Sequence, residues 1–368
     1  MKKAAPALLP PASSASLPCM NQEADDGLIL RSRTVQARLR TPSGQEVDLP
    51  VEIRTSPVTG RTCRIALSRS REREPGTESL PGPPPGAAHP ESCPFCPPRL
   101  QDRTPMLRPD LFPCDRLEHE TSTLFPNLYP YGPFSAVSLF DSAHFVEIGT
   151  ASRDSYTASL KNCIAYLARI KAAQPDVRHM AITQNHLPSA GGSLVHPHLQ
   201  VNAESIPANH QRTISRRAAS FHARTGRLIF SELLDLEKAN GSRVIGRTGS
   251  WEWLAAFAPE GFFEIWGLLP GQTSLFDPSP EVWGDLAQGI LNVQRFYRSL
   301  NRNSYNLGLL SFEDRESRLE LRAVIMARSN YAPWVRNDHT GFEVMLGDMT
   351  TFTAPEDTAA RARAFFTP

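Results

Sequence analysis

Apolar residues recur three or four positions apart in two long segments of the chain. This spacing is typical of amphipathic helices, and it predicts one helix over residues 155–174 and another between residues 280 and 300. The apolar positions are Leu160, Ile164, Leu167 and Ile170 in the first segment and Val282, Leu286, Ile290, Val293 and Tyr297 in the second. A last helix is predicted from Pro355 to about Phe366, with Thr353 and Glu356 as its capping box.

Shorter apolar runs predict strands over residues 179–183, 262–269 and 319–326. In residues 51–69, a turn marked by Pro57, Thr59 and Gly60 separates two further strand-like runs. Strands and helices are mixed without the regular alternation of a doubly wound sheet. The pattern therefore favours an α+β fold.

Length and composition limit the organisation of the chain and its partners. The 368 residues favour two domains, or one domain built from two similar halves. Prolines cluster in residues 1–27, which we interpret as a disordered tail rather than a signal peptide, and in a Pro-rich loop over residues 74–92, which should separate structured pieces without forming one.

The charge and the cysteines narrow the class of protein further. The net charge of +1, with no basic blocks, gives no reason to expect nucleic acid or a membrane surface as a partner, and no apolar run is long enough to span a bilayer. Six cysteines in a chain of this length do not form a disulfide scaffold. We therefore expect small-molecule partners and a cytoplasmic location.

The segment "GGSLVHPHLQV", residues 191–201, carries the most specific chemistry. As a strand it would place His196, His198 and Gln200 on one face and apolar residues on the other. Gly191 and Gly192 would let the backbone approach a ligand, and Ser193 adds a hydroxyl, so the segment predicts a phosphate site beside a nucleophilic imidazole. The alternative is a structural strand whose histidines bond backbone carbonyls.

Cys93 and Cys96 are spaced as half of a tetrahedral zinc site. Two ordinary buried cysteines, or a redox pair, are the alternatives. Zinc would need two more ligands.

Five segments together resemble the galactose-1-phosphate uridylyltransferase family of the histidine-triad superfamily: "SCPFCPP", "FPNLYPYGPF", "FDSAHF", "AGGSLVHPHLQV" and "WLAAFAPEGFFEIWGLLP". The similarity runs, with gaps, from about residue 51 to the end of the chain, and its second half is looser. It implies two histidine-triad-like halves, each an antiparallel half-barrel sheet packed with helices. Residues 28–210 would form the catalytic half and residues 211–368 the second half.

The resemblance also implies a reaction. His198 would attack the α-phosphorus of a nucleotide sugar and hold the nucleoside monophosphate covalently, and Gln200 would hydrogen-bond the phosphoryl group. Ser193 and the glycine-loop amides would stabilise developing charge, and Asn185 is the asparagine that precedes the loop. Phe125 and Asn127 match the segment that lines the base and ribose, although Phe125 could be core.

The family's zinc ligands fall on Cys93, Cys96, His144 and His196, with His119 a competitor for His144. This zinc would be structural. A second metal is not expected, because Leu319 to Arg322 replace a His-x-His and a carboxylate is missing near Thr213.

The sugar-contacting segment is only partly preserved. Glu343 is either a sugar contact or an ordinary surface carboxylate. Met349 stands where the family's sugar-binding Gln would fall, and a thioether cannot make the hydrogen bonds of an amide to a sugar hydroxyl. The identity of the sugar therefore stays open.

Our leading hypothesis is a nucleotidyltransferase that works between a nucleotide sugar and a sugar 1-phosphate. The alternatives are a phosphorylase-type adenylyltransferase that uses inorganic phosphate, with ADP-glucose or adenylylsulfate as donor, a hydrolase, and a catalytically silent zinc and nucleotide-binding protein. Since members of the family commonly dimerise, a homodimer is also expected.

Overall fold

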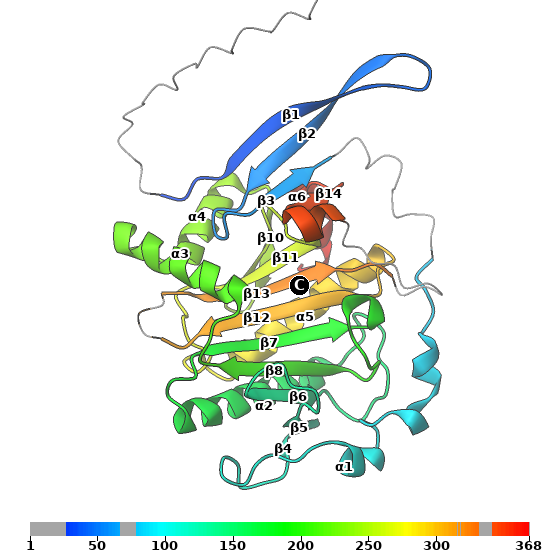
Figure 1. Cartoon of the computed structure of the whole chain (residues 1–368), viewed down its shortest axis with the longest axis vertical. Coiled ribbons are helices and arrows are strands. Elements are labelled where there is room, and N and C mark those ends of the chain that lie inside the picture. Colours follow the sequence, from blue (N-terminus) through cyan, green and yellow to red (C-terminus); the bar gives the residue numbers. More distant parts are fainter. Residues whose placement is uncertain (1–26, 67–78, 315, 317, 331–340, 368) are drawn as a thin grey trace, which may run out of the picture.

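The computed structural model describes residues 27–66, 79–314, 316, 318–330 and 341–367. Its main feature is a ten-stranded antiparallel sheet with the strand order β4-β5-β6-β8-β7-β12-β13-β11-β10-β9 (Figure 1). The first five strands are β4 Leu117–His119, β5 Ser122–Pro126, β6 Phe134–Leu139, β7 His179–His186 and β8 His198–Glu204. The others are β9 Val244–Thr248, β10 Trp251–Ala255, β11 Phe262–Leu269, β12 Tyr305–Phe312 and β13 Leu321–Ala327.

The sheet consists of two halves with the same topology. In each half, three consecutive strands form a meander, a long helix follows, and a hairpin returns with its second strand beside the meander. The helices are α2 Arg153–Ala173 and α5 Glu281–Ser299. The halves join where β7 pairs with β12, so they share one continuous sheet. The predicted fold class, α+β with antiparallel sheets packed on helices, is confirmed.

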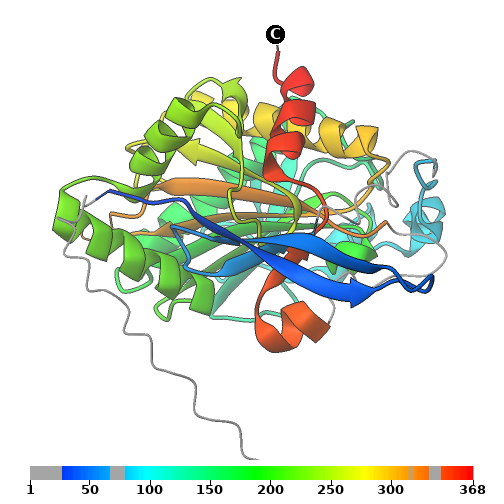
Figure 2. The same ribbon diagram turned by 90° about the horizontal axis from the view of Figure 1, so that it is seen from above.

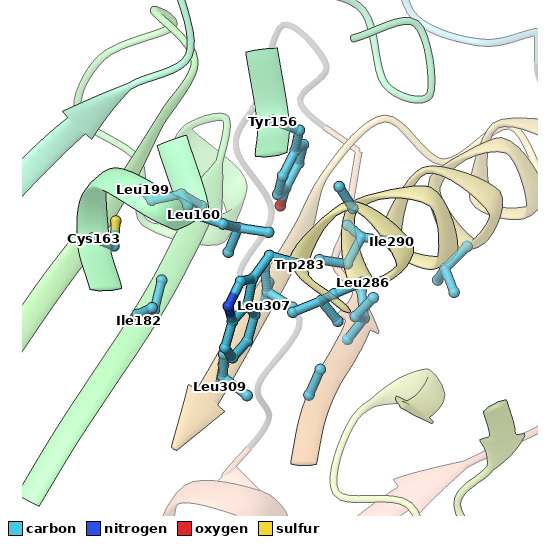
Figure 3. Close-up of a cluster of buried hydrophobic side chains, with 14 of the residues drawn as sticks. Tyr156, Leu160, Cys163, Ile182, Leu199, Trp283, Leu286, Ile290, Leu307 and Leu309 are labelled. Atoms are coloured by element: carbon cyan, nitrogen blue, oxygen red, sulfur yellow. The ribbon is translucent and has the colours of Figure 1, made fainter. Parts of the chain in front are cut away.

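The largest core lies between the sheet and the two long helices. Figure 3 shows side chains of β7, β8 and β12 meeting those of α2 and α5, among them Ile182, Leu199, Leu307, Leu309, Tyr156, Leu160, Cys163, Trp283, Leu286 and Ile290. Because strand side chains alternate, Leu199 and Val201 point into this core while His198 and Gln200 point to the other face. We call that other face the site face.

Two more helices pack on the site face of the second half. They are α3 Asn209–Thr225 and α4 Ile229–Asn240, whose apolar residues form a cluster with Leu254, Trp266 and Leu268. The boundary predicted between residues 210 and 211 falls in the first turn of α3. Part of the second half of the sheet is therefore covered on both faces.

A separate four-stranded sheet brings the two ends of the chain together. Its order is β1-β2-β3-β14, with β1 Arg31–Arg40, β2 Glu46–Thr55, β3 Thr62–Ile65 and β14 Met349–Thr351. The β1–β2 hairpin and α5 lie on opposite sides of the view in Figure 2. β3, which lies in the segment that we assigned to the catalytic half, pairs with β14 from the C-terminal segment.

Most predicted elements are confirmed, with differences at their ends. The two long helices, the turn with Gly60 at φ +76°, and the strands near residues 179, 262 and 319 are all present. The capping box is wrong: α6 Pro355–Ala362 has Ala354 as its N-cap, and Glu356 instead accepts hydrogen bonds from Arg54 and Arg243.

Two predicted segments lie partly or wholly outside the described residues. The structure does not describe residues 1–26 of the predicted tail or residues 74–78 of the Pro-rich loop. The rest of the loop differs from the expectation, since Pro85–Ala88 and Pro90–Ser92 form short 3-10 helices. The remaining α-helix among the described residues is α1 Arg99–Arg103, shortly after the cysteine pair.

Candidate functional site

His198 is the first residue of β8, and its imidazole is held in one tautomer. The Nδ1–H donates to the carbonyl oxygen of His196 at 2.7 Å, so Nε2 keeps its lone pair. Burial lowers the pKa of His198, against a smaller raising effect of that hydrogen bond. His196 and Pro197 precede the strand, so the predicted row of three polar residues is reduced to His198 and Gln200.

A chain of amide hydrogen bonds fixes the orientation of Gln200. Asn185 Nδ2 donates to Gln200 Oε1 at 3.3 Å, and Asn306 Nδ2 donates to Asn185 Oδ1 at 2.7 Å. Arg328 Nη1 in turn donates to Asn306 Oδ1 at 2.6 Å. Gln200 lies on the same face of β8 as His198, and with its oxygen bonded to Asn185 its NH₂ group is left as a donor at this face. Asn306 and Arg328 were not found from the sequence, since they come from the second half.

The loop between β7 and β8 is tightly folded around a short 3-10 helix, Pro188–Ala190. Leu187 has φ 71°, a backbone conformation that costs free energy for a residue other than glycine and that the surrounding loop must hold in place. A Cβ at Gly192 would lie 2.8 Å from the carbonyl oxygen of Asn185, so only glycine fits there.

The expected role of the glycine amides needs correction. The N–H groups of Gly191 and Gly192 donate to the carbonyls of Pro188 and Leu187 at 2.9 and 3.0 Å, so they are already bonded inside the loop. Ser193 is exposed, so its hydroxyl can reach a phosphoryl oxygen.

Four predicted ligands converge on one buried point. One ligand atom each from Cys93, Cys96, His144 and His196 lies within 4.8 Å of the others. His144 Nδ1 is 3.3 Å from Cys96 Sγ, and His196 Nδ1 is 3.5 Å from Cys96 Sγ and 3.9 Å from Cys93 Sγ. A tetrahedral zinc site would separate sulfur and nitrogen by about 3.5 Å. The cluster could therefore hold one metal ion.

The outer nitrogens of both histidines are fixed by backbone carbonyls. His196 Nε2 bonds the oxygen of Asp141 at 3.1 Å, and His144 Nε2 bonds the oxygen of Gly86 at 2.9 Å. Such bonds orient metal-ligating imidazoles. The competitor His119 lies in β4, outside the cluster.

Phe95, inside the cysteine turn, is a site residue that sequence reasoning missed. Its ring packs edge-on against His198, His196 and Phe125, with centroid distances of 5.6, 6.0 and 5.2 Å. Phe125 is 1% exposed and belongs to a small core beneath Phe95, so it has no free ring face for a base. The signal in the sequence that could have identified Phe95 is its position as the aromatic residue between Cys93 and Cys96.

Asn127 and Glu343 lie in different surroundings. Asn127 begins the exposed turn after β5, where its Oδ1 accepts from the Tyr129 N–H at 3.0 Å. Glu343 accepts from Thr350 Oγ1 and lines a cavity with residues such as Arg61 and Asp348, away from the loop at residues 187–193.

The late strand of the second half carries other chemistry in place of His-x-His. Glu320 accepts hydrogen bonds from the N–H groups of Phe230, Ser231 and Gly271, so it caps the start of α4. Arg322 is 5% exposed and lies over Trp266, 4.2 Å from the ring centroid. No helix among the described residues is long and apolar enough to cross a membrane.

Comparisons with known proteins agree on the fold. No protein-family model matches the chain. A protein of Archaeoglobus fulgidus, described only as uncharacterized, is 27% identical over 315 residues, which span 85% of this chain and 92% of that protein.

Three solved structures each align with 85% of this chain and 98% of their own. An ADP-glucose phosphorylase from Arabidopsis thaliana with bound ADP-glucose has a TM-score of 0.64 at 21% identity. A GalT-like protein from Arabidopsis thaliana and a uridylyltransferase both have a TM-score of 0.62, at 20% and 19% identity. The chain therefore shares the fold of these three proteins.

Proposed function

We propose that this chain is a nucleotidyltransferase that carries a nucleoside monophosphate on His198, between a nucleotide sugar and a sugar 1-phosphate. The supporting observation is the His198–Gln200 pair: an imidazole whose Nε2 lone pair is free, beside an amide whose NH₂ group is fixed toward the same face. This is the arrangement that in-line attack on a phosphoryl group needs.

The transfer needs no strong general acid, because the leaving group is already a phosphate. Nε2 of His198 forms a bond to the α-phosphorus, and the bond from that phosphorus to its bridging oxygen breaks. The bridging oxygen leaves with the electron pair as part of a sugar 1-phosphate. Gln200 Nε2 and Ser193 Oγ stabilise charge on the non-bridging oxygens. An acceptor phosphate then attacks the same phosphorus and frees His198.

Zinc is the metal we propose for Cys93, Cys96, His144 and His196, since two thiolates and two imidazoles form a donor set that suits it. When bound, it would neutralise the two thiolates and tie the cysteine turn to the segment before β8. The chain's own part is positional, because His196 holds His198 through its carbonyl and Phe95 packs on both rings.

The acceptor defines a second candidate, a phosphorylase that uses inorganic phosphate. Its motivation is the similar fold of the ADP-glucose phosphorylase. Both candidates share the adduct on His198 and differ in what removes it. The homodimer and the cytoplasmic location stay predictions.

The test is intact-protein mass spectrometry after brief mixing with UDP-glucose, ADP-glucose, GDP-sugars or adenylylsulfate. The expected result is an added nucleoside monophosphate, absent in His198→Ala. The labelled protein is then mixed with glucose 1-phosphate, inorganic phosphate or buffer. Discharge by the sugar phosphate supports the transferase, discharge by phosphate supports the phosphorylase, and discharge in buffer supports a hydrolase. A folded, zinc-loaded protein that no donor labels would support the silent binding protein.

A further inference from the structure

A second cavity lies on the site face of the second half. It has a volume of about 200 Å³, and it is lined by β12, β13, β11 and the start of α3. Gly308 and Val324 are part of its floor, and a Cβ built on Gly308 would meet no atom of the described residues within 4 Å. The repeated topology places β13 in the second half where β8 lies in the first. The cavity is thus the second half's counterpart of the His198 surface.

Arg322 supplies buried hydrogen-bond donors to this cavity. Its guanidinium is covered by Trp266 and lies 5.1 Å from the centroid of Phe230. Within the described part of the chain, its one hydrogen-bond neighbour is His210 Nε2 at 3.4 Å, and no carboxylate lies within ion-pair distance. Several of its five N–H groups therefore remain for a ligand.

Two carboxyl groups supply acceptors. Glu264 accepts from Trp266 Nε1 and from the N–H of Glu260, while Glu260 accepts from Thr59 Oγ1 and Arg61. Each carboxylate has about four acceptor positions, so capacity is left on both. Burial, followed by the charge of Glu260, raises the pKa of Glu264 to about 7. Two acids beside one arginine make the cavity unsuited to a lone anion.

The cavity is aligned with the proposed phosphoryl site. Gln200 pairs with Thr183, Thr183 with Gly308, and Gly308 with Val324, which gives one row across four strands. Gln200 and Gly308 are two strand spacings apart, about 10 Å. At the near end, Asn306 lines the cavity and is bonded to Asn185, the partner of Gln200. A group attached to a phosphate beside Gln200 can therefore extend toward Gly308.

We propose that this cavity binds the sugar ring of the nucleotide sugar and of the sugar 1-phosphate. The inference rests on the proposed function. Sugar hydroxyls both donate and accept, which matches Arg322 beside Glu260 and Glu264, and the C–H face of a sugar ring matches the apolar floor of Leu310, Val324 and Met326.

The test fills the cavity without touching the nucleophile. In Gly308→Val, a branched side chain suited to a strand occupies the open space, and Gly308→Ala is the matched control. The rate of adduct formation on His198 is measured with UDP-glucose against UDP and with ADP-glucose against ADP. We expect Gly308→Val to lower the rate with the nucleotide sugar at least tenfold, and to leave the rate with the nucleoside diphosphate within twofold.

Equal slowing of both donors, or of neither, would overturn the sugar subsite. Binding of glucose 1-phosphate alone, measured by calorimetry, separates this failure from that of the proposed function: it should be lost in Gly308→Val and kept in His198→Ala, whether or not an adduct forms. If Gly308→Val lowers the unfolding temperature, Glu264→Gln, which keeps the side-chain shape, takes its place and should weaken the same binding at least fivefold.

Discussion

At the scale of single residues, the site depends on which atoms are already bonded. Among the described residues, one nitrogen of His198 bonds a backbone carbonyl and the other has no hydrogen-bond partner, while Gln200 has its oxygen bonded and its NH₂ group without a partner. The sequence predicted both residues. It could not predict that Gly191 and Gly192 use their amides inside the loop, because residue types do not show where backbone hydrogen bonds go.

Asn185 should matter because it orients Gln200. In Asn185→Ala, the Gln200 amide loses its fixed orientation, and we expect adduct formation to slow by about ten- to a hundredfold, the cost of one to two hydrogen bonds. Stopped-flow quench followed by intact mass gives the rate. Asn202→Ala, on the same face of β8, is the control and should stay within twofold. Equal effects of both changes would show that Asn185 acts through stability alone.

Glu264 should make stability depend on pH. Its pKa is raised from 4.5 to about 7 in the folded protein, among Glu260, Arg322, His210 and the Trp266 N–H. The folded state then binds this proton more tightly, so the contribution to the free energy of unfolding is present below pH 4.5 and is lost as the pH rises through 7.

The comparison with Glu264→Gln isolates this contribution. The free energy of unfolding of the natural chain, relative to the variant, should fall on the order of 3 kcal/mol between pH 4.5 and pH 8. Urea unfolding at several pH values measures it. If the free energy of unfolding depended on pH in the same way in the two proteins, the raised pKa of Glu264 would be contradicted.

At the scale of elements, three segments far apart in sequence build the metal cluster. The cysteine turn supplies two ligands, the loop after β6 supplies His144, and the segment before β8 supplies His196. Spacing predicted the two cysteines, and the family resemblance predicted the two histidines; the structure brings all four together as a group that could hold a metal. The Pro-rich loop was expected to be separate, yet Gly86 receives the His144 hydrogen bond. The sequence cannot show such a contact, because every residue has a backbone carbonyl and residue type does not determine which one accepts.

Loss of one ligand should uncouple the cluster from His198. We expect Cys96→Ser to lose stoichiometric zinc and to slow adduct formation at least tenfold, while far-ultraviolet circular dichroism stays close to that of the natural chain, because the sheet does not depend on the cluster. Zinc content is measured by mass spectrometry of the metal. Cys114→Ser, an exposed thiol, is the control. Full activity of a zinc-free Cys96→Ser protein would contradict the positioning role.

Glu356 joins α6 to two buried arginines. It accepts from Arg54 at 2.9 Å and from Arg243 at 2.6 Å, and both arginines are less than a tenth exposed. We expect Glu356→Ala to lower the free energy of unfolding by about 2 kcal/mol, since each arginine keeps a second carboxylate. Asp357→Ala, exposed on the same turn, should change it by less than about 0.5 kcal/mol in the same denaturation measurement.

At the scale of the whole molecule, the two halves form one sheet, and the β7–β12 seam carries polar groups between them. Chain length and the family resemblance predicted two halves, and strong apolar patterns predicted the long helices and several strands. The sequence could not predict that Asn306 and Arg328 reach the first half, or that β3 pairs with β14. Both depend on long-range pairing that no local pattern encodes.

Glu343 poses a question about assembly. None of the residues of the 187–193 loop lines its cavity, which shares Glu260 with the cavity beside Arg322. A contact of Glu343 with the substrate of the partner subunit is testable in a homodimer. Mixing inactive His198→Ala with inactive Glu343→Ala under exchange should then restore about a quarter of the natural activity. A Glu343→Ala protein with full activity would make Glu343 a surface carboxylate.

The covalent bond to His198 is the central claim, and locating the adduct tests it most directly. The protein is labelled with the best donor, digested at alkaline pH, where a phosphoramidate survives, and sequenced by tandem mass spectrometry. The account predicts a nucleoside monophosphate on His198, which is lost on acid treatment and absent in Gln200→Ala at early times. An adduct on another residue, or turnover of the donor with no adduct while His198→Ala remains active, would contradict it.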